Sequence, residues 1–150
     1  MHYQQLINQL NVEETILFQI EKTSKLSKLY SQREIDALGI DITIEQWILL
    51  KIIDEHNGLT QKELADRTLR DPASITRTLD ILSKKGFIER QSVPENRRQY
   101  SIALQKKGSD FIKSFFPIVQ KQRAQSINGI SNKDIESLNR ILKKIQENMS

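Results

Sequence analysis

The chain of 150 residues contains no cysteine and only two histidines. The absence of cysteine excludes disulfide bonds, thiolate metal ligands, thiol-based redox sensing and cysteine nucleophiles. The two histidines, at positions 2 and 56, lie far apart in the sequence, so we expect no metal site. Function classes that depend on a catalytic thiol or on soft metal ligands are therefore excluded.

Proline and glycine are also scarce, with three and five residues, so a turn-rich sandwich or barrel is disfavoured and a mainly α-helical fold is expected. The 21 Ile and 16 Leu predict an aliphatic core, and a chain of this length buries about 70% of its unfolded surface. There is no apolar run of membrane-spanning length, and the N-terminus lacks the features of a signal peptide. We expect a cytoplasmic protein with no membrane contact.

Charge is distributed unevenly along the chain. Residues 1–61 carry five Lys/Arg and nine Asp/Glu, residues 62–107 carry eleven and six, and residues 108–150 carry seven and four. A basic central block with an acidic N-terminal third is typical of a protein that binds nucleic acid, although a run of charge also suits a solvated surface.

Apolar spacing and capping residues predict the first helices. Apolar side chains recur at three- and four-residue steps over residues 12–38, which indicates one long amphipathic helix that Gly39 ends. Thr43 and Gln46 form the capping box of a second helix over residues 44–55. Because that helix is apolar on nearly all sides, we expect it to be central and buried.

Two shorter helices follow. Thr60 and Glu63 form a second capping box, and Asp71 caps a fourth helix that has Pro72 in its first turn, where no amide hydrogen is needed. One face of this fourth helix is apolar, through Ile75, Leu79 and Leu82. The opposite face is small, polar and basic: Ala73, Thr76, Arg77, Asp80 and Lys84.

The next segment predicts a β-hairpin. Residues 87–90 and 100–104 have the composition of short strands, and the polar loop 91–99 between them carries Arg97 and Arg98 at its tip. A helix resumes near Lys106, and Pro117 must either kink it or divide it into two. Ser131 caps the last helix, whose apolar stripe requires a partner helix: Ile135, Leu138, Leu142, Ile145 and Met149.

Helix, turn, short helix, polar-faced helix and basic hairpin together form a winged helix-turn-helix. An α-helix fits the major groove of B-DNA, and guanidinium groups suit the narrow minor groove. The expected DNA-binding residues on the fourth helix are Ala73, Ser74, Thr76, Arg77 and Lys84, and those of the wing are Asn96, Arg97 and Arg98. Among them, Thr76 and Arg77 are the expected base readers. Thr60, Lys62 and Arg70 are candidate phosphate contacts.

Five strings in this order resemble the MarR family of bacterial transcription regulators. They are Ile42–Trp47, Leu59–Ala65, Ser74–Arg77, Leu82–Arg90, and Asn96–Arg98 leading to Leu104 and Gly108. Each string is weak alone, but their order and spacing from about 42 to 108 are specific. The sequence departs from the family at Asn96, where an Asp is usual, and this removes a charge that could hold the wing arginine.

The resemblance implies a homodimeric repressor that binds a palindromic operator, with recognition helices about one DNA turn apart. It implies a DNA-binding lobe over residues 42–105, flanked by dimerisation regions at 1–41 and 106–150 that intertwine into one unit. The dimerisation residues would include Ile16, Ile20, Phe115, Leu138, Leu142 and Ile145. Family members often release DNA when a small aromatic or phenolic effector binds, and this is the one ligand expected; no cofactor is implied.

Two other function classes compete with a DNA-binding regulator. A winged helix can serve protein contact, as an antirepressor or assembly module, because a fold alone does not fix a function. The basic wing tip and the polar reading face favour double-stranded DNA over a protein partner. An enzyme is not expected, because the sequence contains no phosphate-binding glycine loop and no paired His and carboxylate at a plausible spacing.

Overall fold

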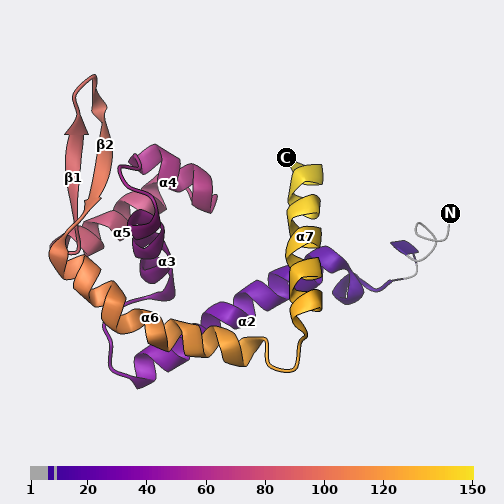
Figure 1. Ribbon diagram of the computed structural model, residues 1–150. Coiled ribbons are helices and arrows are strands. Elements are labelled where there is room, and N and C mark those ends of the chain that lie inside the picture. The colour runs from indigo at the N-terminus through magenta and orange to yellow at the C-terminus, as the bar shows by residue number, and fades with distance from the viewer. Residues whose placement is uncertain (1–6, 9) are drawn as a thin grey trace. The chain divides into compact units, whose positions relative to one another are not determined.

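The computed structural model describes residues 7, 8 and 10–150; residues 1–6 and 9, which include His2, lie outside the described part. In chain order the named elements are a 3₁₀ turn (Val12–Glu14), α2 (Ile16–Ala37), α3 (Ile44–Glu55), α4 (Gln61–Thr68), α5 (Pro72–Lys84), β1 (Ile88–Val93), β2 (Asn96–Leu104), α6 (Lys106–Ser126) and α7 (Asn132–Met149) (Figure 1). Residues 1–112 and 113–150 form two compact units. The predicted mainly α-helical, winged helix-turn-helix fold is confirmed.

The first helix begins later than the sequence predicts. Helix α2 begins at Ile16, and the expected start at residue 12 is wrong, because Val12–Glu14 forms a separate 3₁₀ turn. The hydroxyl of Thr15 donates to the carbonyl oxygen of Val12 at 2.7 Å, and Thr15 itself is extended (φ −69°, ψ 147°). A threonine that bonds the preceding backbone in this way competes with the helical hydrogen bond and interrupts the helix.

Helix α3 begins at the predicted capping box. Thr43 Oγ1 accepts from the backbone N–H of Gln46, and Gln46 Oε1 accepts from the backbone N–H of Thr43, each at 3.1 Å. Its core-facing side chains are buried: Trp47, Leu49, Leu50 and Ile53. The sequence predicted burial on nearly all sides of this helix. That prediction is wrong for one side, because Ile48 is 41% exposed.

The helix-turn-helix forms as predicted. Thr60 Oγ1 accepts from Glu63 N at 3.1 Å to cap α4, and the Asp71 carboxylate accepts from Ser74 N at 2.9 Å to cap α5. The apolar face of α5 is fully buried through Ile75, Leu79 and Leu82. Burial of this face leaves the polar face of α5 directed away from the core.

The turn between α4 and α5 contains a strained residue. Leu69 adopts the left-handed conformation (φ 52°, ψ 29°), and its side chain is 93% exposed. A left-handed L-residue costs about 1–2 kcal/mol, which no burial offsets at this position.

Replacing Leu69 by glycine is therefore expected to stabilise the protein by about 0.5–1 kcal/mol, since relief of the left-handed strain exceeds the entropy that glycine adds to the unfolded chain. Urea unfolding at fixed protein concentration measures this difference. Leu38→Gly is the matched control, because Leu38 is also an exposed leucine after a helix but has φ −84°. The control should lower stability, and an equal loss in Leu69→Gly would contradict the assignment of strain.

The wing is a longer hairpin than expected. Strands β1 and β2 pair antiparallel from Ile88 with Leu104 to Val93 with Asn96, so the predicted loop 91–99 is wrong and most of it belongs to the strands. A register shift between Ser92 and Val93 marks an irregularity near the tip. The ladder uses backbone groups and needs no apolar side chains, which explains why polar residues continue both strands. The hairpin extends beyond the helices of the lobe (Figure 1).

The base of the wing is tied to the lobe. The backbone N–H of Ile102 donates to the carbonyl oxygen of Leu59 at 2.9 Å, so the segment before α4 pairs with β2. Gly108 in the first turn of α6 lies so close to Phe87 that a Cβ atom would stand 2.3 Å from the Phe87 carbonyl oxygen. Only glycine fits there, which explains why the MarR-like motif of this sequence ends in a glycine at position 108.

The last two helices complete the chain. Helix α6 runs without division from Lys106 to Ser126 with Pro117 inside it, so of the two alternatives, division into two helices is ruled out. Ser131 Oγ accepts from Asp134 N at 3.1 Å and caps α7, as predicted. None of the residues of α7 is buried, although the helix carries an apolar stripe.

Candidate nucleic-acid interface

Three of the five candidate DNA-binding residues on α5 are exposed, and two of these lie close together. Ala73 and Arg77 are exposed in its N-terminal half. Lys84 is also exposed, but it lies in the last turn, about 10 Å along the axis from Arg77 at 1.5 Å per residue. The structure therefore brings Ala73 and Arg77 together and leaves Lys84 apart from them.

The hydroxyl of Thr76 is already engaged. Thr76 Oγ1 donates to the carbonyl oxygen of Pro72 at 2.9 Å and accepts from Gln61 Nε2 at 2.6 Å. The hydrogen that Thr76 could offer to a base is thus used within the helix, and its methyl group remains for contact with a thymine methyl. Gln61, the first residue of α4, is a polar neighbour of the reading face that the sequence pattern did not indicate.

Ser74 and Arg70 form a hydrogen-bonded cluster with a buried threonine. Arg70 donates to Ser74 Oγ through Nη2 at 2.7 Å and to Thr78 Oγ1 at 2.8 Å. Thr78 is 7% exposed, so the guanidinium is directed at the body of the lobe. Arg70 thereby fixes the first turns of α5 against the preceding turn, and the predicted roles of Arg70 and Ser74 in DNA contact stay predictions.

Arg90 on β1 joins the wing to the recognition helix. Its Nη1 lies 2.7 Å from Asp80 Oδ1, and its Nη2 donates to the carbonyl oxygen of Thr76 at 3.1 Å. The pairing of Asp80 with Arg90 neutralises a carboxylate that would otherwise repel DNA from this face. This role of Arg90 was not predicted from the sequence, although alternation along the strand places Arg90 on the same face as the buried Ile88.

The wing tip is ordered by an asparagine turn. Asn96 Oδ1 accepts from the backbone N–H of Arg98 at 3.1 Å, so the amide provides the turn that an aspartate could also make. The side chain of Arg98 is exposed at the tip of the hairpin. The side chain of Arg97 lies outside the part of the structure that is described.

A groove of about 640 Å³ lies between α4, α5 and the hairpin. It is lined by side chains that include Gln61, Lys62, Thr76, Arg90, Arg98 and Tyr100. Lys62 and Arg98 supply positive charge to this surface, and Asp66 is the acidic residue in its lining. Lysine and arginine outnumber acidic residues in this lining, which is the charge balance that a DNA backbone requires.

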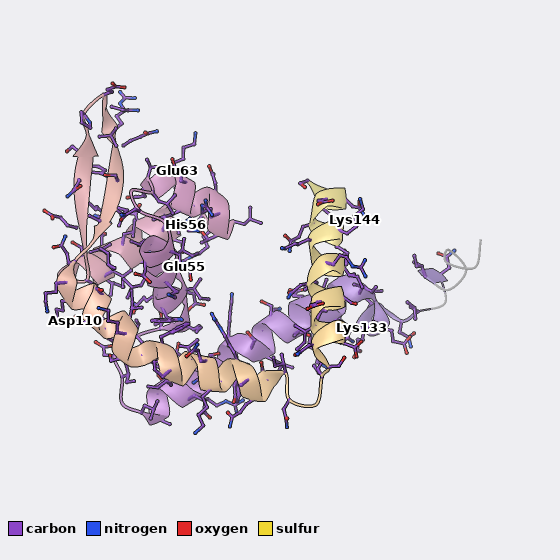
Figure 2. The ribbon with its side chains drawn as sticks, in the orientation of Figure 1. Glu55, His56, Glu63, Asp110, Lys133 and Lys144 are labelled. Carbon is purple, nitrogen blue, oxygen red and sulfur yellow. The ribbon has the colours of Figure 1, made fainter. Side chains whose placement is uncertain are left out.

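Two further candidate phosphate contacts, Thr60 and Lys62, lie at the start of α4. Thr60 is half-buried and its hydroxyl caps α4, whereas Lys62 is exposed in the first turn of the helix. His56 lies at the end of α3 (Figure 2). Its Nε2 lies 3.5 Å from Arg67 Nη1 of α4. This contact links the end of α3 to α4.

The predicted dimerisation residues differ in exposure. On α2, Ile16 is exposed and Ile20 is half-buried. On α7, Leu138 is 53% exposed, and Leu142 and Ile145 are half-buried. Phe115 of α6 is instead buried within the single chain. The α2 and α7 positions thus leave apolar surface that one chain does not cover.

The described residues contain no cluster of three or more His, Cys, Asp or Glu side chains that could hold a metal ion. Among the same residues, every helix is too short or too polar to cross a membrane.

Comparison with known proteins gives a family match over the lobe. Residues 42–100 match the MarR family model. The S. aureus MepR–DNA complex is 23% identical with a TM-score of 0.78, covering 89% of this chain and 98% of that one. A MarR-family regulator from Rhodococcus sp. RHA1 is 19% identical with a TM-score of 0.80 (90% and 94% covered), and the apo form of E. coli MarR is 23% identical with a TM-score of 0.71 (87% and 96% covered). The solved structures share the fold of this chain, and the lobe over residues 42–100 is similar to that of the MarR family of transcriptional regulators.

Proposed function

We propose that this protein is a MarR-family transcription regulator that binds double-stranded DNA as a homodimeric repressor on an inverted-repeat operator. The observation that carries the proposal is the reading face of α5: Arg77 is exposed beside a wing that Arg90 braces against the same helix. A helix of this kind enters the major groove, while the wing tip reaches the adjacent minor groove or backbone. Arg77 reads base edges in this arrangement, and Arg98 contacts phosphate or the minor groove.

Dimerisation is supported by the apolar surface of α2 and α7. Helix α7 exposes Leu138, Ile141 and Met149, and an apolar stripe without burial is unfavourable for a helix in water. We propose that residues 1–41 and 106–150 associate with those of a second copy, and that residues 42–105 bind DNA. A two-fold dimer then presents two recognition helices to two half-sites about one helical turn apart.

Regulation follows from the same arrangement. A small aromatic or phenolic effector would release DNA if it bound one spacing of the two lobes better than the other. The proposal places the protein in the cytoplasm, where its operator is, and assigns it no catalytic role.

The proposal is tested by selecting bound sequences from a random duplex pool at low salt and measuring the subunit number by light scattering. An enriched inverted repeat with half-site centres about 10 base pairs apart, bound by a dimer, would support it. Absence of any enriched sequence would contradict operator binding. Absence of any bound duplex at low salt, where even weak phosphate contacts give binding, would favour the winged helix as a protein-contact module.

A further inference from the structure

One glutamine of α2 makes three hydrogen bonds with its side-chain amide. Gln32 Nε2 donates to the carbonyl oxygen of Ile42 at 3.3 Å and to Asp36 Oδ1 at 2.9 Å. Gln32 Oε1 accepts from the backbone N–H of Ile44 at 3.0 Å. The side chain is half-buried, and both of its donor hydrogens and its acceptor are in use.

The bonds to Ile42 and Ile44 attach α2 to the start of α3. The Gln32 amide donates to the carbonyl oxygen of Ile42 and accepts from the N–H of Ile44. A residue of a parallel β-strand bonds its neighbouring strand in the same pattern. The N–H of Ile44 is one of the first four amides of α3, which have no partner inside the helix. The neighbouring capping box of Thr43 and Gln46 satisfies another, so Gln32 adds to the capping of α3 from a different helix.

The segment that joins α2 to α3, here called the linker (residues 38–43), is also bonded to the end of the recognition helix α5. Lys85, the residue that follows α5, donates through Nζ to the carbonyl oxygen of Asp41 and lies 3.6 Å from the Asp41 carboxylate. Residues 41–44 are therefore bonded to α2 on one side and to the end of α5 on the other. The buried side chain of Ile42 anchors the same segment.

We infer that Gln32 is a positioning residue for DNA recognition: its amide sets the orientation of the recognition helix relative to the dimerisation helix α2, and thereby the half-site spacing that the dimer accepts. This inference rests on the proposed function. Neighbouring base pairs differ by about 34° around the duplex axis, so a small rotation of each lobe changes which spacing fits. The two hydrogen bonds from Gln32 to Ile42 and Ile44 restrict that rotation.

The test uses Gln32→Met, which keeps the length and helix propensity of the side chain and removes all three hydrogen bonds. Gln19→Met is the matched control on α2, because the exposed Gln19 amide donates to the backbone of Glu13 and not to the linker. Each protein is titrated with duplexes that carry the selected half-sites at spacings one base pair shorter and longer, and with a duplex that carries one half-site.

Wild type and Gln19→Met should lose about tenfold in affinity when the spacing changes by one base pair, whereas Gln32→Met should bind the neighbouring spacings within about threefold of one another. Affinity for the single half-site should be unchanged. In the free protein, exchange of the Ile44 amide hydrogen should be about tenfold faster in Gln32→Met, since its acceptor is gone.

Three results would overturn the inference. Retention of the wild-type spacing preference by Gln32→Met would remove the positioning role while leaving the proposed function intact. An equal loss of affinity on every duplex, including the single half-site, would show a merely structural effect. Wild-type protein with no spacing preference would overturn both proposals, and the Ile44 exchange rate would still report whether the bond between Gln32 and Ile44 exists in solution.

Discussion

Replacing Leu138 and Leu142 by glutamate is expected to convert the dimer into monomers and to abolish tight operator binding. Both side chains lie on the apolar stripe of α7, a helix on which no residue is buried by its own chain. Burial of two charged carboxylates in an apolar interface costs several kcal/mol each, by the penalty for burying unpaired ions. A monomer also lacks the linkage between two half-sites, which lowers the apparent affinity for the full operator by about a hundredfold or more.

Light scattering across a concentration series gives the subunit number, and titration of the operator gives the affinity. Arg140→Gln with Lys143→Gln is the control, because these exposed residues lie on the polar face of α7, which also carries Lys133 and Lys144 (Figure 2). The control changes the net charge by the same two units as the leucine substitutions. If the double glutamate variant remained dimeric at micromolar concentration, α7 would not be part of the interface.

The elements that could be predicted from the sequence are those whose signals are local. The capping residues Thr43, Thr60, Asp71 and Ser131 each accept the hydrogen bond expected of them. The apolar side of α5 could also be predicted, because a helix with one apolar face has a single way to bury it. Both signals, the capping residues and the apolar spacing, involve residues no more than four positions apart, so the sequence alone is sufficient to predict these features.

The predictions that were wrong concern elements set by hydrogen bonds that the residue types do not reveal. The hairpin continues through Gln91–Val93 because backbone groups pair across the strands, and polar residues there gave no sign of it. The late start of α2 depends on the orientation of one hydroxyl, that of Thr15. Threonine occurs both inside helices and at their ends, so the residue type alone does not distinguish the two.

The candidate site shows the same division. Its location on α5 and the wing follows from the motif order, but the state of each side chain does not. Thr76 is bonded to Gln61 and Arg70 to Thr78, over 15 and 8 residues respectively. Such contacts depend on how helices pack, and they separate the engaged side chains from the exposed Arg77.

This separation makes Arg77 the residue whose removal should change sequence preference most. Replacing Arg77 by alanine is expected to relax base preference at one position in each half-site, at about 1–3 kcal/mol per bidentate contact with guanine. Because the dimer makes the contact twice, affinity for the selected operator should fall by about 2–6 kcal/mol in total. Titration of operators with single base changes measures both quantities.

Arg98→Ala supplies the contrast, since an exposed wing arginine that meets phosphate should weaken binding to every operator alike. The slope of log affinity against log salt should then decrease by about 0.9 for each phosphate that the variant no longer neutralises, or about 1.8 for the dimer. If Arg77→Ala gave this uniform pattern instead, Arg77 would be a phosphate contact. Base reading would then have to come from groups that the fold leaves exposed or half-exposed nearby, such as Ala73, the Thr76 methyl and the Gln61 amide, and its discrimination would be correspondingly weaker.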